Sequence, residues 1–492
     1  MKVLDRKLFS KLVTIPWILV PSGLETKVSL FSKCLKKYLL KIQRLKPMQD
    51  IEVAPNGDIR LHSGDSLTSE NLSPSASKQY QKRILLNPDM VKTYEDIHES
   101  DRLYLEKFGI TGENLKSGEI NITYDNWKVE EILKSVIPQD VGNLTSFSII
   151  GHIVHVNIKE HLLAYKYIIG QVLLDKIPGA RTVVNKTDAI DNTYRNFQME
   201  ILCGENDLKA QVRENRCIFE FDFSYVYWNP RLCTEHERIL TLISQGDVLF
   251  DVFAGVGPFS IPAARIRHCA FVLANDLNPD SYRWLVHNSS LNKVPPKSFR
   301  ACNKDGWDFI NEDVAQVIEK RWNGAVGASQ EIIGRMHVVM NLPGRATEFL
   351  SAFRGLFNGK EAFSEIAGRD LINIHVYCFT ATENSHNEAI SLVETNIGVK
   401  LTAKEVAFVR KVSPSKEMLR VTFELPKEVL FIKEGNLLAQ PHPKRIRIEK
   451  SVTPEPESEK HGEAKNEEAK NEATVEANSE QQNPRSVQSS WS

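Results

Sequence analysis

Apolar and polar residues alternate in a regular way along the second half of the chain. Stretches with an apolar residue every three or four positions, beginning with residues 233–243, separate a series of short apolar runs. The runs are VLFDVF (248–253), FVLAND (271–276), FRACN (299–303), HVVMN (337–341), INIHVYCF (372–379) and a last pair near 406–412 and 418–423. Runs of this length are typical of strands, and the intervening pattern is typical of helices. The alternation predicts an α/β domain over 226–431 with a mainly parallel, doubly wound sheet.

The first half of the chain carries a mixed pattern. Helical spacing marks residues 94–108, 127–136 and 161–174, and strand-like runs are 147–158, 180–184, 198–202, 211–212 and 217–223. We interpret 84–225 as one or two small α+β modules. Residues 50–80 are rich in Ser, Asn and Asp and are expected to form a flexible connection.

Composition is that of a globular protein, with 41% hydrophobic and 25% charged residues. No run of eighteen apolar residues occurs, so we expect no membrane association. The seven cysteines are scattered and form no CxxC pair, which favours neither a disulfide framework nor a zinc site. We therefore expect a reducing compartment and no bound metal.

Charge is unevenly distributed. Residues 1–49 contain eleven Lys and Arg against Asp5 and Glu25, a pattern found both in mitochondrial import signals and in a surface helix of a folded N-terminal region. We keep both interpretations for a basic region over 1–80. Residues 450–492 are Glu-rich and almost free of large apolar side chains, so we expect a disordered tail. The chain without this tail is more basic than the net charge of −1 suggests, which is compatible with a nucleic-acid partner.

A glycine-containing loop follows the first strand of the α/β domain. Gly255 and Gly257 lie in AGVGPFS, directly before the helical run IPAARI. A dinucleotide fingerprint requires glycine where Ser260 stands, and it has no counterpart for Asp251. The pattern acid-x-Phe-x-Gly-x-Gly instead resembles the first motif of class I methyltransferases. Taken alone, the loop is also compatible with an ordinary strand–helix turn.

Polar residues follow the next three strands in order. Asp276 is well spaced to accept hydrogen bonds from the two ribose hydroxyls of an adenosine, in a methyl donor or in NAD. Asp305 is placed to accept from an adenine amino group, or else to cap a helix. Asn341 precedes Pro343 in a loop that alone would be a simple turn. Because the carboxyl ends of parallel strands form the binding edge of such a sheet, these residues together predict a nucleoside-type cofactor site.

The segments DNTYRNFQME, FDFSYVYWNPRLCTEHERI, DVFAGVGPFSIPAA, ANDLNP and NLPG, collinear within 84–431, resemble the eukaryotic tRNA (guanine-37-N1)-methyltransferase family. The resemblance implies a Rossmann-like methyltransferase domain, S-adenosylmethionine as cofactor, and tRNA with guanosine at position 37 as substrate. It further implies an N-terminal module that checks the tRNA body and a base that is flipped out for reaction. We expect a monomer, present in the mitochondrial matrix, nucleus and cytoplasm.

The resemblance also assigns roles to individual residues. Glu235 matches the general base that removes the N1 proton, and Arg195 matches the arginine that stabilises the charge on O6. Tyr227 and Pro343 match residues that shape the base pocket. The cofactor contacts carry over to His236, Asp276, Leu277, Asp305, Gly306 and Asn341. We expect burial to raise the pKa of Glu235, because an ordinary glutamate is too weak a base. Without the resemblance, Glu235 would be a first-turn acid of a helix capped by Thr234, and Arg195 a surface charge.

Two sequence features depart from archaeal relatives: NLPG replaces Asn-Pro-Pro-Tyr, and His236 stands where some have Arg. The first leaves open which residue stacks on the base. Three alternatives to methyl transfer remain. They are an aminocarboxypropyl transferase of the wybutosine pathway, a non-catalytic tRNA-binding protein, and an NAD-dependent oxidoreductase. Arg195 with the YWNPRLCTEH segment favours methyl transfer, and retention of the polar residues at the strand ends argues against a degenerate pocket.

Overall fold

The computed structural model describes residues 4–21, 23–53, 59–61, 79–144, 146–190, 197–325, 334–401 and 405–432. Arg195 and the tail predicted from residue 450 onwards lie outside these residues, so their predictions are not addressed by the structure. Within the described residues, no helix is long and apolar enough to cross a membrane.

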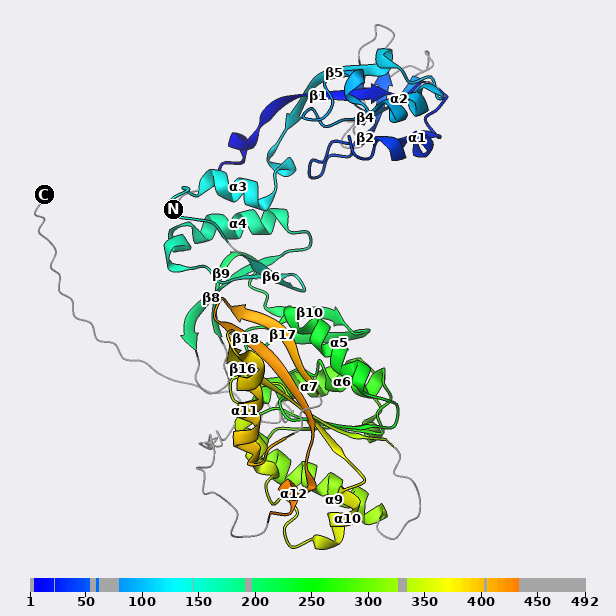
Figure 1. Ribbon diagram of the computed structural model, residues 1–492. Helices are drawn as coiled ribbons and strands as arrows, with labels where there is room; N and C mark the ends of the chain where they lie inside the picture. The colour runs from blue at the N-terminus through cyan, green and yellow to red at the C-terminus, as the bar shows by residue number, and fades with distance from the viewer. Residues whose placement is uncertain are drawn as a thin grey trace, which may run out of the picture. The chain divides into compact units, whose positions relative to one another are not determined.

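The second half of the chain folds around a seven-stranded sheet (Figure 1). Its strands are β12 (Val248–Asp251), β13 (Phe271–Asn275), β14 (Phe299–Cys302), β15 (Met336–Met340), β16 (Ile372–Ala381), β17 (Glu405–Ser413) and β18 (Lys416–Glu424). The helices are α5 (Cys233–Leu242), α6 (Ser260–Arg265), α7 (Pro279–Leu291), α8 (Gly306–Asp308), α9 (Ala315–Ala325), α10 (Ser364–Ala367), α11 (Ser385–Ile397) and α12 (Lys427–Leu430). Every strand predicted for this domain is present, and the predicted α/β class is confirmed.

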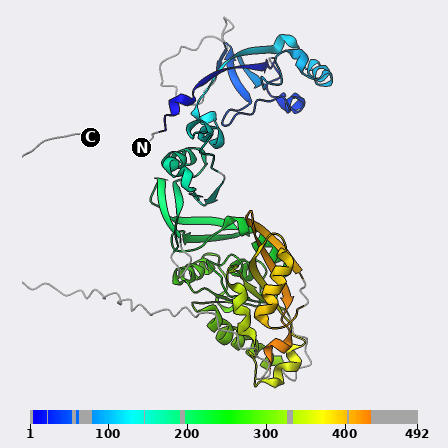
Figure 2. The same ribbon diagram turned by 60° about the vertical axis from the view of Figure 1, so that its left-hand side comes forward.

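Strand order determines where a ligand can bind. The order is β14-β13-β12-β15-β16-β18-β17, with parallel pairing from β14 to β16 and antiparallel pairing of β18 with both of its neighbours. In the turned view, the orange strands β17 and β18 lie at one edge of this sheet (Figure 2). From β12 the chain adds β13 and β14 on one side of the sheet, and from β15 it adds the remaining strands on the other side. The carboxyl ends of β12 and β15 therefore mark the topological switch point, where open α/β sheets bind ligands.

Both faces of this sheet are buried, and successive residues of each strand enter different cores. Phe250 belongs to the cluster that includes α9 and α11, whereas Leu249 belongs to the cluster that includes α5, α6 and α7. On β16 the same alternation sends Val376 to the first core and Tyr377 to the second. Burial on both faces explains why these strands are nearly continuous apolar runs. It also turns Tyr377 toward α5.

A four-stranded sheet and a separate hairpin precede the α/β domain. The sheet has the order β6-β7-β8-β9, with β6 (Phe147–Ile150), β7 (Ile153–Val156), β8 (Thr182–Ile190) and β9 (Phe197–Gly204). The hairpin pairs β10 (Lys209–Glu214) with β11 (Cys217–Asp222), and α3 (Val129–Val136) and α4 (Lys166–Lys176) also belong to this region. The single strand-like run predicted over 147–158 is wrong, because Gly151, with φ of 59°, turns the chain into the antiparallel pair β6–β7.

The N-terminal residues form a five-stranded sheet of order β3-β2-β4-β1-β5. Its elements are β1 (Lys11–Leu19), α1 (Val28–Leu35), β2 (Met48–Val53), β3 (Ile59–Leu61), β4 (Gln79–Leu85), α2 (Glu99–Glu106) and β5 (Leu115–Ile122). Strand β1 pairs with both β4 and β5, so the basic N-terminal residues fold together with residues beyond 84. The predicted boundary between 80 and 84 therefore crosses a single sheet. Parts of the predicted flexible connection are strands, and 54–58 and 62–78 lie outside the described residues.

Candidate active site

The glycine loop after β12 has the conformation that its sequence requires. Gly255 and Gly257 have φ of 56° and 99°, in a region that side-chain-bearing residues rarely adopt. A Cβ on Gly257 would lie 2.6 Å from the Cδ1 of Ile261, whereas a Cβ on Gly255 would meet no atom within 4 Å. Gly257 thus allows the loop to pack on its own helix, and Gly255 borders open space where a ligand can approach the backbone.

Asp276, at the end of β13, connects the glycine loop to the next helix. One carboxylate oxygen accepts a hydrogen bond from the Gly255 N–H at 2.8 Å, and the other accepts from the Asn278 N–H at 2.9 Å. Burial raises the pKa of Asp276 to about 6, against the effect of these two bonds. A carboxylate has about four acceptor positions, so both oxygens retain capacity for ribose hydroxyls.

Asp305 and Gly306 follow β14. Asp305 caps the short helix α8, because its Oδ1 accepts from the Trp307 N–H at 2.9 Å. The helix cap considered as an alternative is therefore present, and the second oxygen has no donor among the described residues. Gly306 is buried, and a Cβ there would lie 2.9 Å from the ring of Phe253. The backbone carbonyl of Leu277 accepts a hydrogen bond from the side chain of Asn303 at 3.0 Å, which ties the end of β13 to the end of β14.

Two residues at the switch point carry buried acceptor oxygens that lack a well-formed hydrogen bond. The Oδ1 of Asn341 is buried without a hydrogen bond to any described residue, and the buried carboxylate oxygens of Asp251 form no well-aligned hydrogen bond, although the Ser260 hydroxyl and the Phe253 N–H lie close enough to lower the Asp251 pKa. Burial, reinforced by the charge of Asp276, raises the pKa of Asp251 to about 7. Unpaired buried acceptors are rare and call for a ligand or another specific explanation. With Asp276 and the open space at Gly255, they fit the polar groups of S-adenosylmethionine, which carries an ammonium group, ribose hydroxyls and an adenine amine.

His236 lies against the glycine loop rather than at the surface. Its ring packs edge-on against Phe259 with centroids 4.6 Å apart, and its Nδ1 lies 2.5 Å from the Oε1 of Glu214 on β10. Both side chains of this pair are buried. Glu214 therefore orients the imidazole and brings the hairpin β10–β11 into contact with the predicted cofactor site.

Glu235 occupies the neighbouring position on α5 and is 3% exposed. Its Oε1 accepts from the Tyr377 hydroxyl at 2.8 Å and from an Arg420 nitrogen at 3.1 Å, and its Oε2 accepts from Arg238 at 2.8 Å. As predicted from the sequence, burial raises the pKa of Glu235, and the nearby Glu405 acts in the same direction. Arg420, Tyr377 and Arg238 oppose the rise but do not cancel it.

Sheet register explains how this carboxylate is held. Tyr377 on β16 and Arg420 on β18 are directly paired residues of adjacent strands, so their side chains leave the sheet on one face. That face carries the core to which α5 belongs. The start of α5 also differs from the expectation, because Thr234 does not cap it. Asn229 instead caps the short helical turn η6 (Pro230–Leu232) that leads into α5, accepting from the Arg231 N–H.

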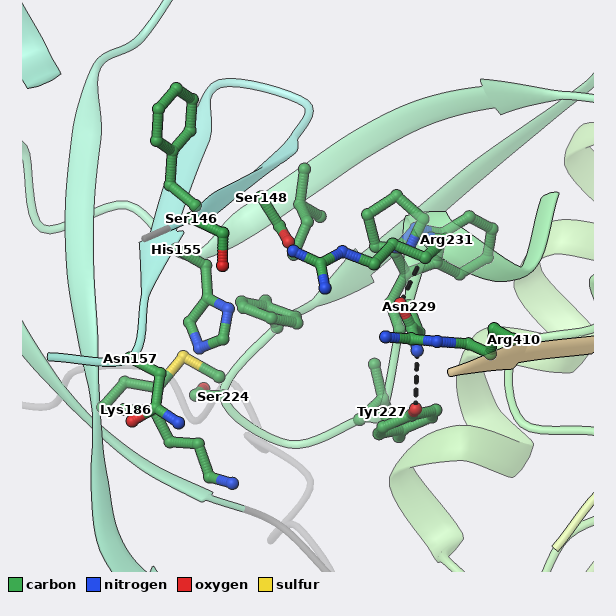
Figure 3. Close-up of a pocket in the computed structure, with 17 residues that line it drawn as sticks. Ser146, Ser148, His155, Asn157, Lys186, Ser224, Tyr227, Asn229, Arg231 and Arg410 are labelled. Carbon is green, nitrogen blue, oxygen red and sulfur yellow. Dashed lines mark hydrogen bonds between the residues drawn. The ribbon is translucent and has the colours of Figure 1, made fainter. Parts of the chain in front are cut away.

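A cavity of about 350 Å³ lies beside this helix, between the four-stranded sheet and the segment 223–231. Tyr227, which is 56% exposed, lines it, whereas Glu235 and Pro343 do not belong to its lining. Arg231 and Arg410 reach into it from the side opposite Asn157 and Lys186 (Figure 3). Burial, and after it the positive charge of Arg231, lowers the pKa of Arg410. Burial, with smaller effects of Lys186 and Arg231, lowers the pKa of His155 to about 4. The cavity is therefore suited to a negatively charged or strongly polar ligand.

Several residues of the site carry no recognisable sequence signal. The Asn275 side chain joins the ends of three strands, bonding to the carbonyls of Val252 and Lys304 and to the Lys304 N–H. Asn288 bonds to Glu220 on β11 and to the carbonyl of Val256 in the glycine loop. Such contacts join residues more than twenty positions apart, so only the fold reveals them.

Comparisons with known proteins agree with this geometry. Residues 129–207 match a family model described as TYW2 N-terminal domain, and residues 210–361 match the TRM5/TYW2 methyltransferase domain. A tRNA (guanine(37)-N(1))-methyltransferase of Pediculus humanus subsp. corporis is 44% identical over 451 residues, covering 91% of this chain and 89% of that protein. The enzyme of the same description from Mus musculus is 41% identical over 455 residues, covering 92% and 83%.

A solved structure supports the fold. Trm5b from Pyrococcus abyssi has a TM-score of 0.51 and 22% identity, over 83% of this chain and 98% of that one. At that identity the likeness speaks for the fold alone, and the family follows from the longer and closer matches to the louse and mouse proteins. The chain belongs to the tRNA (guanine(37)-N(1))-methyltransferase family.

Proposed function

We propose that this protein transfers a methyl group from S-adenosylmethionine to N1 of guanosine 37 in tRNA, with Glu235 as the general base. The observation that carries the proposal is the position of Glu235, a buried carboxylate on the helix that also presents His236 to the glycine loop. Membership of the family and the unpaired acceptors at the switch point support the choice of cofactor.

The chemistry requires removal of a proton. N1 of guanine is protonated at neutral pH, so its electron pair becomes available only as a base takes that proton. Bound S-adenosylmethionine supplies an electrophilic methyl group. Glu235 accepts the N1 proton on a carboxylate oxygen, and the raised pKa brings the carboxylate closer to the working pH. The electron pair left on N1 would form the new N–C bond as the bond between the methyl group and the sulfonium sulfur breaks and its electron pair stays on sulfur. Negative charge would develop on O6 in the transition state.

The remaining predicted residues keep their proposed roles. Arg195, outside the described residues, would stabilise the charge on O6 as a permanently protonated guanidinium. Tyr227, whose exposed ring lines the cavity, would help to shape the pocket of the flipped base, and Pro343 would stiffen the loop after Asn341. Asp276, Leu277, Asp305, Gly306, Asn341, Gly255, Gly257 and His236 would hold the cofactor.

A single-turnover assay tests the proposal. The protein is incubated with labelled S-adenosylmethionine and unmodified tRNA transcripts that differ only in carrying guanosine or adenosine at position 37. We expect label only in the guanosine transcript, and equal labelling of both or of neither would refute the activity. Glu235→Gln should slow methyl transfer by at least a hundredfold. Glu237→Gln, at the exposed neighbouring position of α5, should not.

Location in the cell and oligomeric state are further proposals. We propose a monomer present in the mitochondrial matrix, nucleus and cytoplasm. Because β1 is a central strand of the N-terminal sheet, cleavage of an import signal beyond residue 11 would remove part of that sheet. Fusion of residues 1–49 to a fluorescent protein, compared with the full chain, would test import, and analytical ultracentrifugation would test the monomer.

A further inference from the structure

The carboxylate of Glu235 is held asymmetrically. Two donors that are fully buried, Tyr377 and Arg420, both contact Oε1. Oε2 has one donor, Arg238, whose side chain is 38% exposed. One oxygen is thus fixed from inside the sheet, and the other is covered from the solvent side.

The inner donors are part of a rigid arrangement. Tyr377 and Arg420 are paired neighbours in the middle of β16 and β18, and Arg420 also forms an ion pair with Glu405 on β17. Removing either partner from such a buried group leaves an unsatisfied polar atom, which is costly. These contacts therefore fix the direction of the Glu235 side chain whether or not RNA is bound.

Arg238, the donor to Oε2 on the solvent side, can leave Glu235 for another acceptor at low cost. Arg238 also donates to the carbonyl of Phe408 at 3.2 Å, and Arg410, two residues further along β17, lines the cavity. Arg231, four residues before Glu235, lines it as well. A part-exposed ion pair contributes little to stability, and a phosphate oxygen is an equally good acceptor for a guanidinium.

Resting on the proposed function, we propose that Tyr377 and Arg420 hold Oε1 and so position Glu235 for proton abstraction by Oε2, whereas Arg238 covers Oε2 in the free protein and moves to the RNA backbone when tRNA binds. The charged groups around the carboxylate are Arg420 on β18, Arg238 on α5 and Glu405 on β17, with the neutral Tyr377 on β16. In the free protein, two positive charges balance the two carboxylates. Departure of Arg238 leaves one negative charge in excess, so Glu235 becomes a stronger base only when substrate is present.

The positioning role is tested with Tyr377→Phe, which removes one hydroxyl and keeps the ring in the core. The single-turnover methylation rate is measured from pH 5.5 to 9 at saturating tRNA and S-adenosylmethionine. We expect the acid limb of the profile to move up by about one pH unit, because a donor to the carboxylate is lost, and the plateau to fall about tenfold. Tyr282→Phe on α7, outside this network, is the matched control. A Tyr377→Phe profile identical to that of the unaltered protein would overturn the positioning role.

The covering role is tested with Arg238→Met by calorimetric titration of tRNA, without S-adenosylmethionine, in buffers of different ionisation enthalpy. The unaltered protein should take up protons on binding, since uncovering Glu235 raises its proton affinity. Arg238→Met and Glu235→Gln should both take up fewer protons than the unaltered protein. Arg369→Met, an exposed arginine after α10, should behave like the unaltered protein. Equal proton uptake by the unaltered protein and by Arg238→Met would overturn the proposed covering of Oε2 by Arg238.

The proposed function and the roles of Tyr377 and Arg238 are refuted by different results. If the unaltered protein does not methylate guanosine 37, or if Glu235→Gln methylates at full rate, the proposed function itself is wrong. If the unaltered protein is active and Glu235→Gln is slow, but Tyr377→Phe and Arg238→Met behave like their controls, only the present inference is wrong.

Discussion

The carboxylate of Asp276 accepts a hydrogen bond from the backbone N–H of Gly255 at 2.8 Å, which joins the glycine loop to the end of the adjacent strand across 21 residues. The same carboxylate receives the Asn278 N–H at the start of α7. The Asp276 side chain therefore fixes the backbone on both sides of the proposed ribose site. Its replacement should weaken cofactor binding both by removing a ribose contact and by releasing this backbone.

Asp276→Asn should weaken binding of S-adenosylmethionine by at least tenfold. The amide supplies only one acceptor oxygen, so its NH2 group must face either the Gly255 or the Asn278 N–H, donor against donor. Isothermal titration calorimetry with the cofactor measures the effect. Asp280→Asn, two residues into the same helix, is the control and should bind as the unaltered protein does. Unchanged affinity in Asp276→Asn would rule out the ribose role.

The two loop glycines should respond differently to substitution by alanine. Gly257→Ala places a Cβ within 2.8 Å of both Ile261 and Leu285 at an unfavourable φ, so we expect a marked fall in Tm. Gly255→Ala meets open space and should cost only about 1–2 kcal/mol for its backbone conformation. If a ligand approaches the Gly255 backbone, its alanine variant should nevertheless lose cofactor affinity. Thermal unfolding and calorimetry on both variants decide this, and full affinity in Gly255→Ala would place the ligand elsewhere.

The sequence predicted the elements of the α/β domain well, because their signals are local. Strand length, apolar content and the glycine loop at 255–257 are all read within a few neighbouring residues. Strand β1 was missed for a reason that is equally local. It contains Pro16, which weakens a strand prediction, and it lies in a basic stretch that also fits an import signal.

The candidate site was predictable only in part. Asp276, Asp305 and Asn341 could be found because each follows a strand, and parallel strands bring such positions to one edge. The donors to Glu235 could not be found in this way, because Tyr377 and Arg420 lie 142 and 185 residues away in sequence. Within KEMLRVTFE, Arg420 has the appearance of a solvent-facing residue of an edge strand. Only the neighbouring strand β17 and helix α5 make that position an interior one.

Stability should depend on pH through Asp251. Its pKa rises from 3.8 to about 7 on folding, chiefly by burial, so the folded protein holds the proton more tightly than the unfolded chain. The contribution of protonated Asp251 to the stability of the folded protein is fully present below pH 3.8 and is lost as the pH rises through 7. Asp251→Asn removes the buried charge and should stabilise the protein by up to about 4 kcal/mol at pH 8, and much less at pH 4.5. Urea unfolding at the two pH values measures the difference, and a gain independent of pH would contradict it.

Asn341 and Asn275 offer a matched pair of Asn→Ala changes. The Oδ1 of Asn341 is buried without a partner among the described residues, so its removal should leave Tm nearly unchanged while cofactor affinity falls about tenfold. The Asn275 side chain makes three hydrogen bonds at the strand ends, so Asn275→Ala should lower Tm by several degrees. Differential scanning calorimetry with and without cofactor separates the two effects. An equal loss of Tm in both variants would show that Asn341 is structural.

Arg410 should contribute to tRNA binding and not to cofactor binding. It lines the cavity together with Arg231, and partial burial, followed by the charge of that neighbour, lowers its pKa. Two guanidinium groups held close together repel each other, and an RNA phosphate between them would relieve this repulsion. Arg410→Met should therefore weaken tRNA binding several-fold and reduce the slope of log Kd against log salt by about one. Arg369→Met is the control for loss of an exposed positive charge. An unchanged salt slope in Arg410→Met would show that the cavity does not contact the phosphate backbone.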